Sequence, residues 1–529
     1  MSLAGAARTL PVMRWTSALL AGALVIASCT GSDAPPAPET REINAIPAST
    51  TMPPPITAQP GDTLPPPTIA PEPLDYEIEW TELGGNVDEA RLVVPLDYAD
   101  PQGETIELYV TRHRADPDDR IGSLLVNNGG PGSPASTMGI NATSWFLPAI
   151  TERFDVVGWD PRGTGVSGGA VDCIDDAEYD EFFATGDITP DDTSEKAELV
   201  RLAEEFATRC EERVGRALQY IGTNNSARDM DAIRQVLGEE QVSYFGFSYG
   251  SELGAVWATL FPTTVRAAVF DGAADPNADS IESTLQQWIG FENALNTFLA
   301  ECSATTSCAF HNDGDAESAF DALFVQLDES PLPGPEGRAD VNLGVAVTGV
   351  VRAMYSDRFW PALERSLDDA QSGDGAGLLA LQDAYYQRGA DGTYSNLLES
   401  FQAISCADDP ERLTVEEADE QAEVLIGAAP RLFPYTTGSY TCGFFPAALD
   451  PRIDVTGVGA GPIVVVGTTG DPSTPLDSSR RMAASLEDGR LVIVEANQHT
   501  GYRVNSCIED TIHNYLIQLE APDTETVCS

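Results

Sequence analysis

The residues of this sequence with the clearest chemical meaning are Gly-Phe-Ser-Tyr-Gly at 246–250, which match the pattern G-x-S-x-G. They follow a short β-branched and aromatic run at 242–245 and precede a helix-like stretch that stops near Pro262. A sharp strand-to-helix turn exposes a serine hydroxyl, and glycines leave room for such a turn. Ser248 is therefore a candidate nucleophile, although a Gly/Ser turn of this pattern also arises by chance.

A serine hydroxyl needs a base to take its proton, and an imidazole base needs an acceptor that fixes its tautomer. Asp471 follows a strand-like run at 463–466, and His499 follows another at 491–494. The order serine, acid, histidine, with the last two after late strands, is the order of an α/β-hydrolase triad. We therefore expect Ser248 to attack, His499 to act as the general base and Asp471 to orient the imidazole.

Other residues compete for two of these roles. Among the four histidines, the surroundings of His113, His311 and His513 favour surface or packing positions. Asp477 is an alternative acid, because the Gly-Asp-Pro around Asp471 is also typical of a turn. Asp471 is preferred since it lies nearer the end of its strand.

An oxyanion hole requires backbone N–H groups that point at the developing negative charge. The residue after the nucleophile, Tyr249, supplies one. The second is expected from the loop Asn-Asn-Gly-Gly-Pro-Gly-Ser at 127–133, with Gly130 as the donor. A phosphate-binding loop is the alternative interpretation, but the Gly-Lys-Ser/Thr ending of a P-loop is missing.

The elements that must position these residues alternate between strand-like and helical runs, which is typical of an α/β sheet. Between 275 and 455 the sequence is helix-rich and this alternation stops. We predict an α/β-hydrolase fold, with a mostly parallel central sheet, helices on both faces and a large inserted helical cap at 275–455. The core comprises 75–274 and 456–529. Strand-like runs lie at 92–94, 106–110, 123–126, 155–157, 242–245, 265–270, 463–466 and 491–494, and helical runs at 199–210 and 230–237.

The N-terminal residues 1–28 predict an export signal, because two arginines precede an apolar stretch too short to span a membrane. The end of this segment, Ile-Ala-Ser-Cys, resembles a bacterial lipobox, which predicts lipidation of Cys29. The alternative is an ordinary signal-peptidase site with Cys29 incidental. Residues 29–74 are rich in proline and predict an extended tether.

The chain has nine cysteines, an odd number for an exported protein, and eight remain when Cys29 carries lipid. Outside the reducing cytosol these eight are expected to form up to four disulfides. Pairing of nearest neighbours in order is the preferred connectivity. Metal binding is the weaker alternative, as the sequence has no Cys-x-x-Cys pair. The eight are Cys173, Cys210, Cys302, Cys308, Cys406, Cys442, Cys507 and Cys528.

The formal charge of −54 excludes nucleic acid as an expected partner. It is compatible with a protein suited to salty surroundings or with a bias in genome composition, and it does not identify a substrate.

Together these motifs resemble the α/β-hydrolase proline iminopeptidase group, and within it the secreted tripeptidyl aminopeptidases of actinobacteria. The resemblance extends from about Tyr76 to the C-terminus and rests on three segments: 127–132, the Asp-Pro-Arg-Gly-Thr-Gly-Val-Ser at 160–167, and 246–250. Asn128 and Phe445 depart from the usual Pro and Trp of this branch, which puts the shape of the substrate pocket in doubt.

The resemblance implies an enzyme that cuts one to three residues from a free peptide N-terminus, with acidic cap residues holding the ammonium group. Glu292 and Asp408 are the candidates for this role, and a solvated surface charge is the alternative for each. No cofactor or metal is implied. The expected partners are peptide substrates, together with the membrane through the lipid anchor.

The sequence therefore predicts an exported serine aminopeptidase, attached by lipid to the outer face of the bacterial cell membrane, or secreted if Cys29 is not modified. An ester or lipid hydrolase with the same triad is the nearest alternative, because one fold serves many acyl substrates. A non-catalytic envelope protein that binds peptides is a third.

Overall fold

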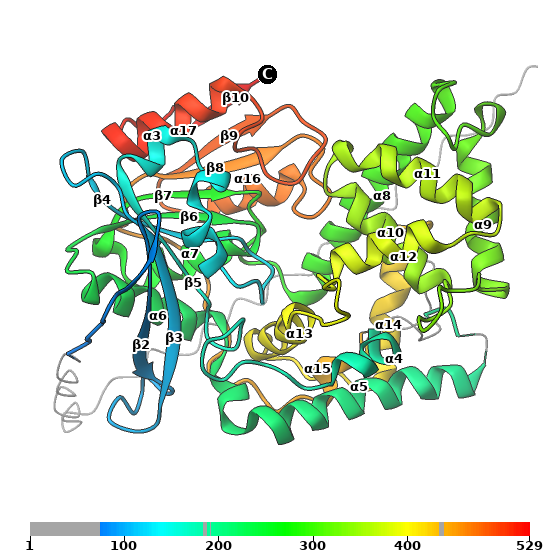
Figure 1. Cartoon of the computed structure of the whole chain (residues 1–529), viewed down its shortest axis with the longest axis horizontal. Coiled ribbons are helices and arrows are strands. Elements are labelled where there is room, and N and C mark those ends of the chain that lie inside the picture. The colour runs from blue at the N-terminus through cyan, green and yellow to red at the C-terminus, as the bar shows by residue number, and fades with distance from the viewer. Residues whose placement is uncertain (1–74, 184–187, 191, 433–438) are drawn as a thin grey trace, which may run out of the picture. The chain divides into compact units, whose positions relative to one another are not determined.

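The computed structural model describes residues 75–183, 188–190, 192–432 and 439–529, which form a mixed sheet flanked by helices (Figure 1). The predicted export signal, Cys29 and the tether lie outside these residues. The strands of the sheet are β1 (Thr81–Gly84), β2 (Val87–Pro95), β3 (Thr105–His113), β4 (Gly122–Asn127), β5 (Phe154–Trp159), β6 (Val242–Phe247), β7 (Val265–Asp271), β8 (Ile463–Thr468), β9 (Gly489–Val494) and β10 (Glu525–Cys528).

The strand order is β1-β2-β3-β5-β4-β6-β7-β8-β9-β10. From β5 to β10 all neighbours are parallel, whereas β1, β2 and β3 attach in antiparallel fashion. The predicted mostly parallel sheet is confirmed, and each expected strand is present. The edge strands β1 and β10 were not predicted, because both are short and largely exposed and lack the apolar run of the inner strands.

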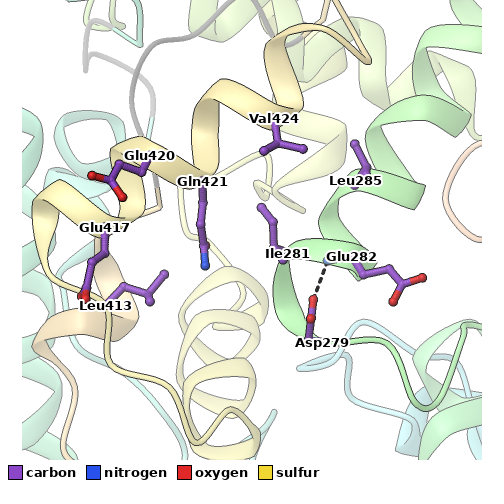
Figure 2. A pocket seen from close by; sticks show the side chains of 9 residues that line it. All are labelled: Asp279, Ile281, Glu282, Leu285, Leu413, Glu417, Glu420, Gln421 and Val424. Atoms are coloured by element: carbon purple, nitrogen blue, oxygen red, sulfur yellow. Dashed lines mark hydrogen bonds between the residues drawn. The ribbon is translucent and has the colours of Figure 1, made fainter. Parts of the chain in front are cut away.

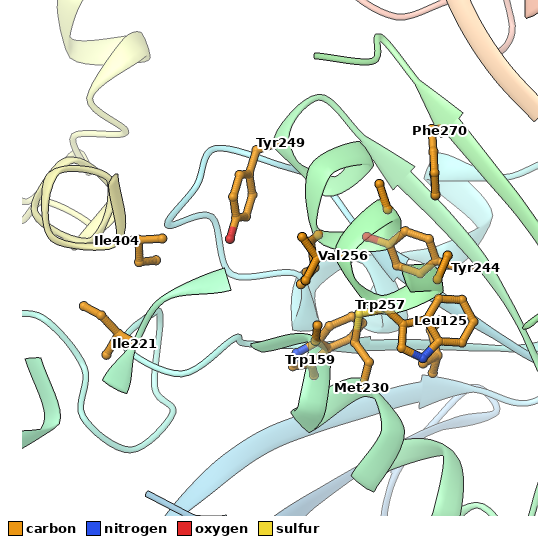
Figure 3. Packing of buried hydrophobic residues seen from close by; sticks show 14 of the residues in the cluster. Leu125, Trp159, Ile221, Met230, Tyr244, Tyr249, Val256, Trp257, Phe270 and Ile404 are labelled. Atoms are coloured by element: carbon orange, nitrogen blue, oxygen red, sulfur yellow. The ribbon is translucent and has the colours of Figure 1, made fainter. Parts of the chain in front are cut away.

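Helices cover both faces of the sheet, which explains why its inner strands read as continuous apolar runs. Successive side chains of a strand point to opposite faces. Leu124 of β4 belongs to the apolar cluster formed with α1, α3 and α17, whereas its neighbour Leu125 packs with α6, α7 and α16. Figure 3 shows part of this second cluster, including Met230 of α6 and Val256 of α7. The helices around the sheet are α1 (Ser136–Ile140), α2 (Ala142–Trp145), α3 (Pro148–Thr151), α6 (Thr223–Val236), α7 (Tyr249–Leu260), α16 (Leu476–Ser485) and α17 (Ser506–Gln518).

Between β7 and β8 the described chain is helical and has an apolar core of its own, which contains Phe298, Phe320 and Leu363. This stretch corresponds to the predicted cap. Its helices are α8 (Ser280–Ala304), α9 (Ala316–Glu329), α10 (Leu343–Met354), α11 (Trp360–Gln371), α12 (Ala376–Tyr385), α13 (Leu397–Asp408), α14 (Val415–Ile426) and α15 (Thr441–Phe444).

A second stretch of chain joins this helical layer. Helices α4 (Tyr179–Phe183) and α5 (Thr193–Val214) lie between β5 and β6 in sequence, yet they contact cap helices. The rings of Phe206 and Phe445 are 6.2 Å apart, and Lys196 pairs with Asp419. The helical run at 199–210, which was predicted to belong to the core, therefore packs against the cap as well.

Helix α13 connects the cap to loops of the core. Ser400 donates a hydrogen bond to the carbonyl of Gly163 at 2.9 Å. The carboxylate of Glu399 accepts hydrogen bonds from the N–H groups of Cys173 at 2.7 Å and Ile174 at 3.0 Å. Because these partners precede β6 in sequence, α13 ties the inserted helices to the part of the chain that leads into β6.

The disulfides confirm the predicted nearest-neighbour connectivity. One bridge joins the segment after β5 to α5, and another joins the end of α13 to α15. The pairs are Cys173–Cys210, Cys302–Cys308, Cys406–Cys442 and Cys507–Cys528. In the part of the chain that the structure describes, no helix is long and apolar enough to cross a membrane.

Candidate active site

Ser248 lies at the turn between β6 and α7 in a strained backbone conformation. Its φ of 55° and ψ of −127° fall in a region that residues with side chains rarely adopt. Two backbone hydrogen bonds hold the turn. The N–H of Ser248 donates to the carbonyl of Asp271 in β7 at 2.9 Å, and the carbonyl of Ser248 accepts from the N–H of Ser251 at 2.7 Å. Strain of this kind is expected where a serine must be presented at the end of a strand.

The loop after β4 approaches this turn closely. A Cβ on Gly129 would lie 2.6 Å from the carbonyl oxygen of Phe247 and 2.8 Å from the Cβ of Ser248, so only glycine fits. The side chain of Asn127 accepts a hydrogen bond from the Gly129 N–H at 2.9 Å and shapes the loop. Gly130, the predicted donor, is the next residue, with a φ of 112°.

The second predicted donor, Tyr249, is the first residue of α7. The N–H groups in the first turn of a helix have no intrahelical acceptor, and they lie at the positive end of the helix dipole. The N–H of Tyr249 is therefore available to a negatively charged oxygen beside Ser248. This position suits the chemistry of an oxyanion hole.

His499 and Asp471 are brought together by the loops that follow β9 and β8. The Nδ1 atom of His499 lies 2.9 Å from each carboxylate oxygen of Asp471. The carboxylate also accepts hydrogen bonds from the backbone N–H groups of Ser473 at 3.0 Å and Thr474 at 2.8 Å. A carboxylate held in this way accepts a proton-bearing Nδ1 and leaves Nε2 as the basic nitrogen.

The environment of His499 favours its protonated form. Burial alone would lower the pKa of His499, but the negative charge of Asp471 and the hydrogen bond to it outweigh burial and raise the pKa above its ordinary value, with a further contribution from Asp271. The Nε2 atom is buried and makes no hydrogen bond to any described residue. The ring of Tyr355, at the end of α10, covers the imidazole edge-on with the centroids 5.5 Å apart.

The competing residues lie elsewhere. His113 ends β3, His311 contacts the carbonyl of Cys302 at 2.9 Å, and His513 contacts the hydroxyl of Tyr502 at 3.0 Å. Asp477 is exposed in the first turn of α16.

With this geometry in place, comparison with known proteins identifies the family. A model of the alpha/beta hydrolase fold matches residues 122–505, which include the serine turn and the His499 loop. The chain belongs to the alpha/beta hydrolase family.

Three relatives of this hydrolase indicate the kind of chemistry that it performs. Serine protease Hip1 of Mycobacterium tuberculosis is 34% identical over 484 positions, covering 86% of this chain and 91% of that protein. Carboxylesterase B of the same species is 33% identical, covering 83% and 86%. Tripeptidyl aminopeptidase of Streptomyces coelicolor is 29% identical, covering 83% and 82%. This alpha/beta hydrolase is thus a serine hydrolase in a family that includes peptidases.

The two predicted substrate-binding residues of this hydrolase have different surroundings. The carboxylate of Glu292, in α8, accepts hydrogen bonds from the backbone N–H groups of Arg431 and Leu432, and burial raises its pKa. Within the described residues no contact links Glu292 to the serine turn. An ammonium-binding role for Glu292 stays a prediction.

Asp408, at the end of α13, is linked to the serine turn. Its carboxylate accepts hydrogen bonds from the N–H and the hydroxyl of Thr223, and that hydroxyl also contacts the hydroxyl of Tyr249. Burial raises the pKa of Asp408 to about 6, although the hydrogen bonds from Thr223 and the charge of Arg452 act in the opposite direction. The Asp408 side chain is therefore ionised at neutral pH and is only partly exposed.

Three residues that contact His499 or the turn of Ser248 were not predicted from the sequence. The hydroxyl of Thr474 lies 3.3 Å from Nδ1 of His499, Tyr355 covers the imidazole ring, and Asp271 accepts the N–H of Ser248. Thr474 and Asp271 could have been found because each lies at or just after the carboxyl end of a buried strand, where the other site residues also lie. Tyr355 comes from the cap and carries no such signal.

A hollow of about 500 Å³ lies in the cap between the first turns of α8 and the helix α14 (Figure 2). Its walls combine apolar and acidic side chains, and none of them belongs to the triad or to the loop at 127–133. The lining residues are Asp279, Ile281, Glu282, Leu285, Leu413, Glu417, Glu420, Gln421 and Val424.

Proposed function

We propose that the protein is an exported aminopeptidase that releases short peptides or single residues from free peptide N-termini through an acyl-enzyme. The observation that carries the chemistry is the pairing of His499 with Asp471. The strained turn of Ser248 is connected to the His499 loop through Asp271, which accepts the N–H of Ser248 and the N–H groups of Gly501 and Tyr502. The relatives named as a serine protease and a tripeptidyl aminopeptidase support a peptide substrate.

In the proposed reaction the hydroxyl oxygen of Ser248 attacks the carbonyl carbon of the scissile bond, and its proton moves to Nε2 of His499. Asp471 holds the imidazole in the correct tautomer and stabilises the imidazolium. The N–H groups of Gly130 and Tyr249 donate to the carbonyl oxygen as it becomes negatively charged. The departing amine takes the proton from His499. Water then attacks the acyl-enzyme and gives a proton to His499, which passes a proton to the oxygen of Ser248 as the acyl group is released.

Recognition of the free N-terminus is assigned to Asp408. Each oxygen of a carboxylate can accept more than one hydrogen bond, so the bonds from Thr223 leave capacity for an ammonium group. The attraction between a cation and a partly buried carboxylate is stronger than the same attraction in bulk water, because the effective dielectric constant is lower. Glu292 remains the second candidate.

Hydrolysis of esters is the second candidate function, and the relative named carboxylesterase B favours it. The same triad and oxyanion hole serve esters and peptides, so the difference depends on the cap. A peptide-binding envelope protein without catalysis is disfavoured by the intact arrangement of His499 and Asp471.

Export and lipid attachment at Cys29 complete the proposal and rest on the N-terminal sequence alone. A Cys29→Ala variant expressed in a bacterium that processes lipoproteins is expected to move from the detergent phase to the aqueous phase in Triton X-114 partitioning. Equal partitioning of the two proteins would contradict lipidation.

The central test compares peptide-chromophore conjugates with free and blocked N-termini, together with simple esters, on the purified mature protein. We expect turnover of the free peptides, weak turnover of the blocked ones, and loss of both in Ser248→Ala. Turnover that ignores the N-terminal block would reject the aminopeptidase assignment in favour of a general hydrolase. Activity that survives in Ser248→Ala would reject the nucleophile.

A further inference from the structure

Asp271 is a fully buried carboxylate at the end of β7 for which the proposed reaction has no direct role. One of its oxygens accepts a hydrogen bond from the N–H of Gly501 at 2.6 Å, and the other accepts from the N–H of Tyr502 at 2.8 Å. Both donors lie within three residues of His499. The carboxylate of Asp271 therefore anchors the backbone of the loop that carries the histidine.

The backbone of the same residue anchors the nucleophile. The carbonyl oxygen of Asp271 accepts the N–H of Ser248 at 2.9 Å, at the residue whose strained conformation presents the hydroxyl. One residue thus holds the turn of the nucleophile by its main chain and the loop of the base by its side chain. A displacement of Asp271 would change the position of Ser248 relative to His499.

The next residue, Gly272, completes the contact with the third loop. Its carbonyl accepts the hydroxyl of Thr474, in the loop of Asp471, at 2.9 Å. With a φ of 67°, its backbone packs so closely that a Cβ would lie 3.0 Å from Cε1 of His499. The pair 271–272 therefore contacts the loops of all three proposed triad residues.

The charge of Asp271 also acts on the site. The ionisable groups that interact with it are His499, Asp471 and Tyr502, and its hydrogen-bond donors are backbone N–H groups. Burial raises the pKa of Asp271 to about 6, against the opposing effects of the N–H donors and of His499, and the charge of Asp471 raises it further. In return, Asp271 is among the groups that raise the pKa of His499.

We propose that Asp271 is a positioning residue, which holds the histidine loop in register with the serine turn and supplies a second negative charge that favours protonated His499 during proton transfer. The inference rests on the proposed roles of Ser248 and His499. It adds a residue that lies outside the triad and the oxyanion loop.

The test is Asp271→Asn, which keeps the size of the side chain and removes its charge. An amide can accept one of the two N–H groups but turns its own NH₂ toward the other. We measure the rate of inactivation by a fluorophosphonate from pH 5 to pH 9, because this reagent reports on Ser248 and His499 whatever the substrate. We expect inactivation to be slower by up to about 100-fold, because a displacement of about 1 Å between reacting groups costs about that much. The acid limb of the pH–rate profile, where protonation of His499 slows the reaction, should move to lower pH. The pKa of His499 falls because a nearby negative charge is lost.

Asp155→Asn is the control for the loss of a buried carboxylate, and it also removes an ion pair with Arg120 at 2.7 Å. Asp155 is also buried and also accepts a backbone N–H, from Ala115 at 2.9 Å, but it lies near the amino end of β5, away from the triad. Its variant should keep the wild-type acid limb. A rate loss in Asp271→Asn with an unmoved acid limb, or the same profile in both variants, would overturn the proposal.

A second measurement on the unaltered protein covers the case in which Asp271→Asn does not fold. Histidine ¹³C NMR, with the His499 signal assigned by its absence in His499→Ala, should show a titration that departs from a single step because Asp271 and His499 titrate as a coupled pair. A single-step titration of His499 would reject the inference. If wild type and Ser248→Ala react alike with the fluorophosphonate, the proposed nucleophile itself fails, and the inference fails with it.

Discussion

Thr223 donates two hydrogen bonds to the carboxylate of Asp408, one from its N–H at 2.6 Å and one from its hydroxyl. The same hydroxyl contacts the hydroxyl of Tyr249, the residue after the proposed nucleophile. A hydrogen-bonded chain therefore runs from the end of a cap helix to the start of α7. Figure 3 shows Tyr249 at the start of α7, together with Ile221 and Ile404 of the same apolar cluster.

Asp408→Asn tests whether this carboxylate binds the substrate's ammonium group. We expect KM for peptides with a free N-terminus to rise about tenfold or more, because a hydrogen bond to a charged group contributes about 1.5 to 3 kcal/mol. KM for esters and for peptides with a blocked N-terminus should stay unchanged. A fall in kcat for all three substrate types would instead assign Asp408 to the support of Tyr249.

The pH dependence of the wild type provides a check on the same residue without a mutation. Because the pKa of Asp408 is raised to about 6, its negative charge is present above pH 6 and is lost as the pH falls through that value. KM for free peptides should therefore rise below pH 6, while KM for esters stays flat. Parallel curves for the two substrates would contradict the assignment.

Gly129→Ala tests the contact between the oxyanion loop and the serine turn. The added Cβ would lie 2.6 Å from the carbonyl oxygen of Phe247, so the loop must move away. We expect kcat to fall about 100- to 1000-fold, as when one oxyanion donor is lost. Gly238→Ala is the control, since Gly238 also has a positive φ of 73° but has open space around it. That variant should lose about 1 kcal/mol of stability and keep its kcat.

Glu399→Gln tests the cost of burying a charge where α13 joins the core. Burial raises the pKa of Glu399 to about 7 from the ordinary 4.5. The folded state thus binds a proton more tightly than the unfolded state, and stability falls as pH rises from about 4.5 to about 7. Glutamine can accept the same N–H groups without a charge. We expect the variant to match wild type near pH 5 and to exceed it by about 1 to 3 kcal/mol at pH 8. Urea unfolding at pH 5 and pH 8 measures the free energy of unfolding of both proteins. The same difference between variant and wild type at the two pH values would contradict the prediction.

Replacing Cys406 and Cys442 together with serine tests the covalent link between α13 and α15. The bridge closes a loop with a sequence separation of 36 residues. Its loss should reduce the free energy of unfolding by about 3 to 4 kcal/mol, through the greater freedom of the unfolded chain. Thermal unfolding of the two proteins, each with and without a reductant, gives the comparison. In reductant, which also opens the other three bridges, the two proteins should unfold at similar temperatures.

Much of the core could be predicted because its strands are buried on both faces and are therefore apolar throughout. The loops at Asp471 and His499 follow such strands, so their meeting point could be inferred from strand order alone. The edge strands β1 and β10 lack this pattern and were missed. The disulfides followed from nearest-neighbour pairing.

The contacts that the cap makes could not be predicted from sequence patterns, for a physical reason. The apolar face of α5 predicts that Phe206 is buried but not against which partner, and the structure places it beside Phe445 from a segment far along the chain. Likewise, Tyr355 reaches His499 only through the packing of the cap. Contacts between segments so distant in sequence leave no periodic signal in either segment.

Helix α13 limits how this enzyme can be redesigned or diversified. Exchanging the insert between relatives is the obvious way to change substrate range, and the simplest splice points would be the ends of β7 and β8. A graft made there would leave Gly163, Cys173 and Thr223 behind without Ser400, Glu399 and Asp408, their partners on α13. It would also leave α4 and α5 of the recipient without the cap helices that they contact. The transferable module is therefore discontinuous, and new specificity in this scaffold must be acquired together with matching changes in the segment before the nucleophile strand.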